Sequence, residues 1–147
     1  MIIAVIVLLF LAVTTFFRLY QFYEISGTSM SPTLEEGEMV FMERGPIMPG
    51  RGDIVFFRAN VNDFVYVKRV VALPGETVEI RNNRVLIDGK VLTEPYVSDR
   101  EPIPDFGPVL IPEDHVFVLG DNRKESYDSR EMGPVPIEFI IGKLADE

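Results

Sequence analysis

Two short segments contain side chains that could carry out chemistry together. Ser29 lies in GTSMSP (27–32), where a glycine before it and a proline after it indicate a tight turn. Lys68 lies in YVKRVV (66–71), an apolar run that is typical of a strand. A serine hydroxyl needs a base to become a nucleophile, and burial lowers the pKa of a lysine toward the range of a useful base. The two segments therefore suggest a serine nucleophile paired with a lysine.

A third segment, GDNRKESYDSR (120–130), is dense in polar groups and follows an apolar strand that starts near His115. We expect four of its charged residues, Asp121, Arg123, Asp128 and Arg130, to pair with one another and so to fix the loop. The hydroxyl of Ser126 would then point at the lysine. Without this network, the segment is an ordinary solvated loop, and that interpretation stays open from the residues alone.

The N-terminal segment must place these residues near a membrane. Residues 1–17 contain no charged side chain. Extended to Tyr20 as a helix, the segment would span roughly 30 Å, the thickness of one bilayer core. A cleavable signal peptide would have a basic start and a small-residue cleavage site, which are absent here. A buried core helix is a second alternative, but seventeen residues that are apolar on every side are too many for a helix of a small domain. We therefore expect an uncleaved anchor over residues 1–20.

Composition narrows the remaining function classes. The net charge is −9, with 14 basic and 23 acidic residues, which argues against a nucleic-acid partner because the phosphate backbone requires a basic face. The chain has no cysteine and only one histidine, so we expect no disulfide, no multi-histidine metal site and no cofactor. His115 itself is interpreted as a structural residue.

Beyond Glu24 the chain reads as strands separated by turns, so residues 21–147 are predicted to form one antiparallel β domain. RNNR (81–84) and Asp88-Gly89 are typical hairpin turns. EPIPDFGPVLIP (101–112) contains four prolines and is predicted to be an extended surface connection, while 137–144 could be a short helix or a strand. RGDIVFF (51–57) is interpreted as scaffold. The predicted strands are Met39–Met42, Ile54–Phe57, Phe64–Val71, Val78–Ile80, Val85–Ile87 and Val116–Leu119.

Four motifs in this order, behind an apolar N-terminal segment, resemble bacterial type I signal peptidases, the Ser/Lys-dyad leader peptidases: GTSMSPTL, RGDIVFF, YVKRVVALPGE and GDNRKESYDSR. The resemblance implies an all-β domain of coiled antiparallel sheets behind one transmembrane helix. It also implies that Ser29 is the nucleophile, that Lys68 is the general base and that Ser126 orients the base. The supporting ion pairs would come from Arg69, Asp121, Arg123, Asp128 and Arg130.

The resemblance also implies how the oxyanion is stabilised. The backbone N–H of Ser29 would donate one hydrogen bond to it. Some members have a second donor, a serine hydroxyl two residues before the nucleophile, but this chain has Gly27 there. A backbone group at Gly27 would have to replace it, and one such donor is worth about 3 kcal/mol.

The implied activity is the removal of signal peptides from exported preproteins, with cleavage after small residues in an Ala-x-Ala pattern. The enzyme would be a single-pass protein of the cell membrane, in contact with lipid, with its catalytic domain on the extracytoplasmic face; the charges around the anchor leave this orientation open. Shallow apolar pockets would select the small residues, and our candidates for their lining are Ile25, Met30, Leu34, Tyr66 and Val67.

Three alternatives stay open at the level of sequence. A non-catalytic, membrane-anchored β module would bind a partner through its acidic face and would not need Ser29 or Lys68. A self-cleaving Ser/Lys regulator would share the dyad, but it would carry a basic DNA-binding region, for which the N-terminal segment leaves no room. A processor of pilins or conjugation proteins, or an organelle inner-membrane peptidase, would differ only in its substrates.

Overall fold

A computed structural model describes residues 2–59, 64–97 and 101–145. These residues form one long helix, eleven strands, one short helix and one 3-10 turn. In chain order these are α1 (Ile2–Leu19), β1 (Tyr20–Glu24), β2 (Met39–Arg44), β3 (Ile54–Arg58), β4 (Val65–Ala72), β5 (Thr77–Arg81), β6 (Arg84–Ile87), β7 (Lys90–Val91), β8 (Phe106–Leu110), β9 (His115–Leu119), α2 (Ser129–Met132), β10 (Val135–Pro136), the 3-10 turn (Ile137–Phe139) and β11 (Ile140–Leu144).

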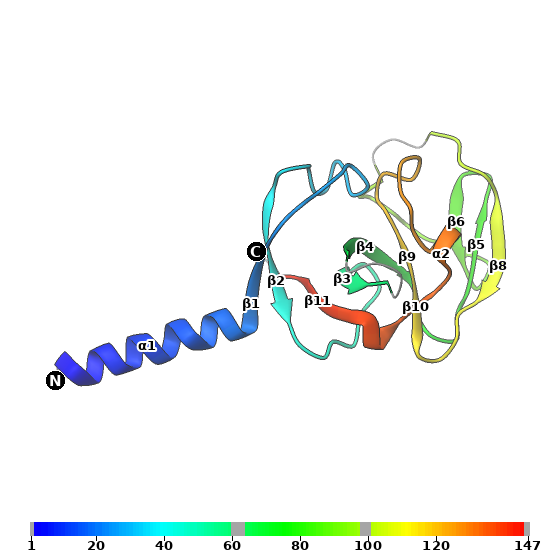
Figure 1. Ribbon diagram of the computed structural model, residues 1–147. Helices are drawn as coiled ribbons and strands as arrows, with labels where there is room; N and C mark the ends of the chain where they lie inside the picture. The colour runs from blue at the N-terminus through cyan, green and yellow to red at the C-terminus, as the bar shows by residue number, and fades with distance from the viewer. Residues whose placement is uncertain (1, 60–63, 98–100, 146–147) are drawn as a thin grey trace.

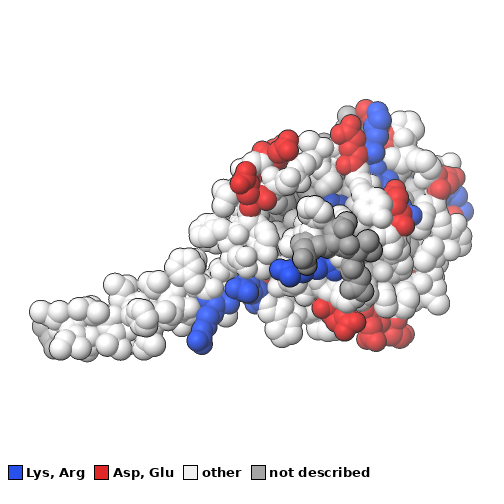
Figure 2. Space-filling model, in the orientation of Figure 1, with Lys and Arg blue, Asp and Glu red and all other residues white. Residues whose placement is uncertain are grey.

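Helix α1 projects away from the β domain (Figure 1), and none of its residues is buried. With 18 residues, the helix is long and apolar enough to cross a membrane, judged by length and composition. Figure 2 shows charged atoms only at the end of α1 that meets the domain, where Arg18 lies in the last turn. The helix passes directly into β1, so the apolar segment and the first strand of the domain are joined without a linker.

The larger sheet has seven strands in the order β1-β2-β11-β3-β4-β9-β10, and all of its recorded pairs are antiparallel. The C-terminal strand β11 lies between β2 and β3, so the chain closes the sheet between two strands from its first half. The sequence left a helix or a strand open for 137–144, and the structure contains both a 3-10 turn and a strand. Strand β4, which carries Lys68, is central, between β3 and β9.

The smaller sheet has four strands in the order β7-β6-β5-β8. Its two tight turns confirm the hairpins predicted from sequence, since Asn82 and Asn83 have φ of 51° and 61° and Asp88 has φ of 49°. The predicted surface connection over 101–112 was wrong in part, because Phe106–Leu110 forms β8 and pairs with β5. Pro108 is tolerated there because β8 is an edge strand, where a missing N–H breaks no ladder on the open side.

Three apolar clusters fill the domain, and β4 contributes to all of them. Val67 packs against a cluster beside β1 and β2, Tyr66 and Val70 belong to one beneath β9 and β10, and Val71 belongs to one that joins the two sheets. Because successive side chains of a strand point to opposite faces, β4 can reach separate clusters with neighbouring residues. This central position surrounds Lys68 with apolar groups.

Candidate active site

Ser29 lies in a compact turn between β1 and β2. Gly27 has φ of +83°, a left-handed conformation that glycine adopts at little cost, and the N–H of Ser31 donates to the carbonyl of Thr28 at 3.0 Å. The N–H of Leu34 donates to the carbonyl of Met30 at 3.0 Å and closes the next turn. These bonds fix the backbone on both sides of Ser29, as the sequence predicted for a segment bounded by glycine and proline.

Lys68 is buried on β4 and reaches Ser29. Its side chain is 4% exposed, and Nζ donates to Ser29 Oγ at 2.7 Å and to the carbonyl of Val67 at 2.9 Å. Burial lowers the pKa of Lys68 to about 8, although the negative charge of Asp128 acts in the opposite direction. Ser29 and Lys68, which the sequence analysis paired although they lie 39 residues apart in the chain, are thus in direct hydrogen-bond contact.

The loop after β9 holds the Ser29 turn in place. The N–H of Asn122 donates to the carbonyl of Ser29 at 3.1 Å, and its side-chain amide donates to the carbonyl of Thr28 at the same distance. Thr33 Oγ1 donates to Asp121 Oδ2 at 2.6 Å. The turn that carries the hydroxyl is therefore positioned by a segment about 90 residues later in the chain.

Gly120 allows this loop to come close. A Cβ at this position would lie 2.2 Å from Ser126 Oγ and 2.5 Å from the carbonyl oxygen of Ser29, which is closer than side chains can approach. Ser126 Oγ is buried and has no hydrogen-bond partner among the described residues. The hydrogen bond to Lys68 that we expected from Ser126 is therefore not made, because Lys68 Nζ is directed to Ser29 and to Val67 instead.

Buried ion pairs support the site, but the partners differ in part from the prediction. Arg69 forms a bidentate pair with Asp121, at 2.8 and 2.6 Å, and donates to the carbonyl of Gly52 at 2.8 Å. Arg123 pairs with Glu94 at 2.6 and 3.1 Å instead of pairing within its own loop. A bidentate guanidinium–carboxylate pair fixes both direction and distance, so each pair ties the loop to a different part of the domain.

Asp128 and Arg130 do pair within the loop, as predicted. Arg130 Nε and Nη2 donate to the two carboxylate oxygens of Asp128, each at 2.8 Å. Asp128 also accepts from the N–H of Gly120 at 3.0 Å and caps α2, together with Glu131. Ser129 Oγ accepts from the N–H of Val118 at 3.0 Å, which fastens α2 to β9.

Sequence reasoning missed two residues of this network, Glu94 and Tyr96. Glu94 is 3% exposed and is the carboxylate partner of Arg123. The ring of Tyr96 lies under the guanidinium of Arg69, with 3.9 Å from Cζ to the ring centre. Burial, and next the charge of Glu94, raise the pKa of Tyr96 to about 12, so the phenol stays neutral. The sequence EPY (94–96) matches no functional motif, and a single acidic residue beside a proline is common in surface loops, so nothing in it indicated a buried ion pair.

The five candidates for a substrate pocket separate into two groups. Ile25, Met30 and Leu34 are buried in one cluster, and Val67 packs against it. Tyr66 packs against a different cluster, because strand alternation turns it to the opposite face of β4 from Val67. The structure therefore places Tyr66 on the other face of β4 from Val67, apart from the other four candidates.

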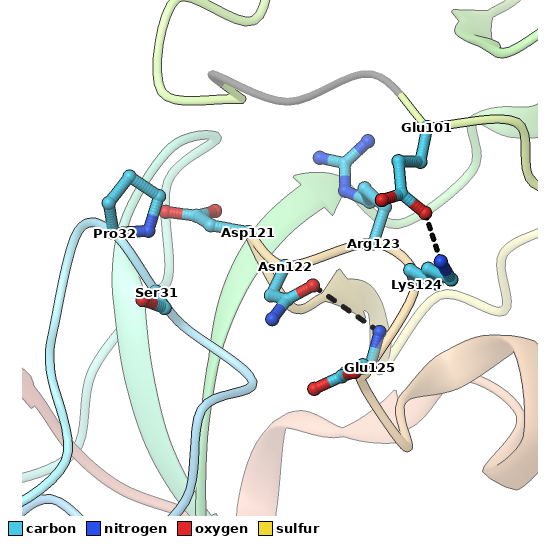
Figure 3. A pocket seen from close by; sticks show the side chains of 8 residues that line it. All are labelled: Ser31, Pro32, Glu101, Asp121, Asn122, Arg123, Lys124 and Glu125. Atoms are coloured by element: carbon cyan, nitrogen blue, oxygen red, sulfur yellow. Dashed lines mark hydrogen bonds and ion pairs between the residues drawn. The ribbon is translucent and has the colours of Figure 1, made fainter.

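A polar pocket lies beside the Ser29 turn (Figure 3). Its lining combines the two loops described above with one residue of the segment before β8, and consists of Ser31, Pro32, Glu101, Asp121, Asn122, Arg123, Lys124 and Glu125. The charged groups in it already have partners: Lys124 is paired with Glu101, Arg123 with Glu94 and Asp121 with Arg69. We interpret this pocket as a consequence of how the loops meet.

The arrangement supplies what acyl transfer by a hydroxyl group requires. It combines a serine in a fixed turn, a buried amine in contact with its Oγ and a low-dielectric surrounding that favours the neutral amine. Among the described residues, the N–H of Ser29 donates to no protein acceptor, so it is available for an oxyanion. At Gly27, the position of the expected second donor, a Cβ would meet no atom within 4 Å.

Comparison with known proteins gives a consistent family. Residues 1–145 match the family described as "Signal peptidase, peptidase S26". The chain is 40% identical to a protein named "Signal peptidase I" from Bacillus licheniformis, over 95% of this chain and 82% of that protein. It is 36% identical to "Signal peptidase I T" from Bacillus subtilis (strain 168), over 95% of this chain and 79% of that protein.

A solved structure agrees. The crystal structure of a signal peptidase I from Enterococcus faecalis V583 matches with a TM-score of 0.61 and 34% identity, over 67% of this chain and 98% of that one. The predicted all-β fold behind an apolar N-terminal helix is confirmed by the observed architecture and by this likeness. Together with the family match, these findings show that the chain belongs to the signal peptidase family, peptidase S26, and is a serine endopeptidase.

Proposed function

We propose that this protein is a membrane-anchored peptidase that removes signal peptides from exported preproteins, with Ser29 as nucleophile and Lys68 as general base. One observation carries the proposal, the 2.7 Å contact between Nζ of a buried lysine and Ser29 Oγ. With a pKa of about 8, roughly a tenth of the Lys68 side chains are neutral at pH 7. With an ordinary pKa of 10.5, this fraction would be about 300-fold lower.

In the proposed reaction, the neutral amine of Lys68 removes the proton from Ser29 Oγ while Oγ attacks the carbonyl carbon after the signal peptide. The N–H of Ser29, helped by a backbone group near Gly27, stabilises the oxyanion. The ammonium then gives its proton to the leaving amine, and an acyl-enzyme forms. A water molecule, deprotonated by the same amine, hydrolyses the ester and regenerates Ser29.

The remaining residues act by position. Ion pairs of Arg69, Asp121 and Arg123 anchor the loop at 120–130 to β4 and to Glu94. This loop in turn holds the Ser29 turn in place by hydrogen bonds. Asp128 caps α2, pairs with Arg130 and accepts a hydrogen bond from the N–H of Gly120. We infer that Ser126, whose buried hydroxyl has no partner among the described residues, rotates to hydrogen-bond Lys68 Nζ and so orients the base while the Lys68–Ser29 contact is kept.

Substrate choice is proposed to come from the cluster beside Ser29. Ile25, Met30 and Leu34 are at most 5% exposed, so little room is left for the residue before the cut. This agrees with a preference for Ala-x-Ala, in which small side chains occupy shallow apolar sites.

The apolar helix α1 is proposed to be a single-pass anchor over residues 1–20, with domain 21–147 on the extracytoplasmic face. Ser29 follows the end of α1 by ten residues, so the site lies close to the lipid surface where a signal peptide leaves the bilayer. Tethering both partners to one membrane raises their effective concentration.

The test uses the full chain in detergent micelles and a preprotein with an Ala-x-Ala site, with the new N-terminus mapped by mass spectrometry. The unmodified chain should produce one cut after the second alanine, and Ser29→Ala or Lys68→Ala should lower kcat by about 10⁴. Two matched controls should keep near-normal rates: Ser31→Ala in the same turn, whose hydroxyl donates to Glu35, and Lys90→Ala on exposed β7. Equal cutting by Ser29→Ala would refute the proposal.

A further inference from the structure

A second cavity, of about 560 Å³, lies on the face of β4 that carries Lys68. Its lining residues in the described part of the chain are all uncharged, and aromatic rings and prolines predominate. They include Phe57, Tyr66, Tyr127, Met132, Pro134 and Phe139. Its volume lies within the range of small-ligand sites, which is roughly 300–1,000 Å³. Neither the dyad nor the cluster around Ile25 uses it.

This cavity adjoins the dyad. Tyr66 is two residues before Lys68 on the same face of β4, a spacing of about 7 Å along a strand. Tyr127 directly follows Ser126, whose Oγ packs with Gly120 near the carbonyl of Ser29. The cavity therefore lies next to Ser29 and Lys68, within reach of a polypeptide that is bound at Ser29.

The two faces of β4 assign the cavity to one side of the scissile bond. Val67 points to the cluster of Ile25, Met30 and Leu34, which the proposed function uses for residues before the cut. Tyr66 points the other way, toward the cavity. A substrate whose scissile carbonyl lies at Ser29 Oγ, with its acyl side at this first cluster, has its leaving side toward the cavity.

We propose that this cavity, the leaving-side pocket, binds an apolar side chain, branched or aromatic, of one of the first two residues after the cleaved bond. This inference rests on the proposed function and adds a specificity site to it. The lining favours such an occupant, since the Phe57 and Tyr66 rings stack at 5.6 Å and Tyr127 lies 6.4 Å from Tyr66. The Tyr127 residue is 57% exposed, so its ring can close over a bound side chain.

The same lining disfavours acidic residues at these positions. A carboxylate in the leaving-side pocket would lose its water, and the described lining residues contain no cation to pair with it. Differences of one apolar group in a pocket change kcat/KM by about 10- to 200-fold. We therefore expect leucine or phenylalanine at one of the two positions to be cut at least about tenfold faster than aspartate.

The experiment measures kcat/KM of the full chain in micelles for peptides that share an Ala-x-Ala site and carry Leu, Phe, Ala or Asp at each of the first two positions after it. Tyr127→Ala should reduce the Leu/Asp ratio to less than about threefold, while Tyr127→Phe should keep it, because only the ring is needed. Met132→Lys should raise the rate for Asp. Phe64→Ala, which removes an exposed aromatic residue outside the pocket lining, should change nothing.

The outcomes separate this inference from the proposed function. If the unmodified chain cuts all peptides at equal rates, the function stands and the leaving-side pocket is refuted. If it cuts none of them, the proposed function fails. If Tyr127→Ala no longer cleaves the peptide with Ala after the cut, Tyr127 has a structural role. The peptide series with the unmodified chain and with Met132→Lys would then decide whether the leaving-side pocket exists.

Discussion

Substitution of Lys68 by methionine should destroy activity and yet stabilise the protein at neutral pH. Lys68 is almost fully buried, and its pKa falls from 10.5 to about 8 because burial disfavours the ammonium. At 1.36 kcal/mol per pKa unit, holding a proton on this amine at pH 7 costs the folded state about 3 kcal/mol. Methionine has a similar shape and carries no charge, so the variant avoids this cost.

The sign of the pH dependence follows from proton binding. Between pH 8 and pH 10.5 the unfolded chain holds the Lys68 proton and the folded chain does not, so the free energy of unfolding rises with pH in this window. Below pH 8 both states are protonated, and the full cost is present. Between pH 7 and pH 10, the free energy of unfolding of the unmodified protein should therefore rise by about 2 kcal/mol relative to that of Lys68→Met.

The assay is denaturant unfolding of both proteins in the same detergent at several pH values. Taking the difference between them cancels the titration of all other groups that the substitution does not disturb. The lost hydrogen bonds to Ser29 and Val67 shift the difference by about 1 kcal/mol each, but this offset changes little with pH. A difference that stays constant from pH 7 to pH 10 would show that the Lys68 pKa is not depressed, and the reasoning would be refuted.

Two further substitutions test the framework around the dyad. Gly120→Ala should lower kcat at least tenfold and reduce Tm, because its Cβ would lie 2.5 Å from the Ser29 carbonyl; activity within twofold of normal would contradict the close approach. Tyr96→Leu should lower kcat severalfold with little change in KM, since the Arg69 guanidinium loses the ring 3.9 Å away, whereas Tyr96→Phe should keep activity. If Phe and Leu behave alike, the ring does not position Arg69.

Local features of the fold could be predicted from the sequence because each depends on a few adjacent residues. The turns at Asn82-Asn83 and at Asp88 need positive φ, which these residue types tolerate, and both formed. The strand character of the Lys68 segment follows from its valines. The apolar helix followed from composition alone, although its C-terminal aromatic residues continue as β1.

Partners distant in the chain were harder to predict. Sequence placed Arg123 in an ion pair within its own loop, but the carboxylate that meets it is Glu94, 29 residues earlier. Alternation along β4 separates Tyr66 from Val67, but it does not say which elements cover each face. That depends on β11 entering between β2 and β3, a long-range pairing for which the local sequence carries no signal.

The central claim is that a neutral Lys68 deprotonates Ser29, and the pH dependence of single-turnover cleavage tests it most directly. With a preprotein substrate bound at saturation, the rate should rise about tenfold per pH unit below pH 8 and level off above it. The stability of the chain, followed in the same samples, controls for unfolding. A rate that is constant between pH 6 and pH 8, or that continues to rise up to pH 10, would contradict a base with this pKa.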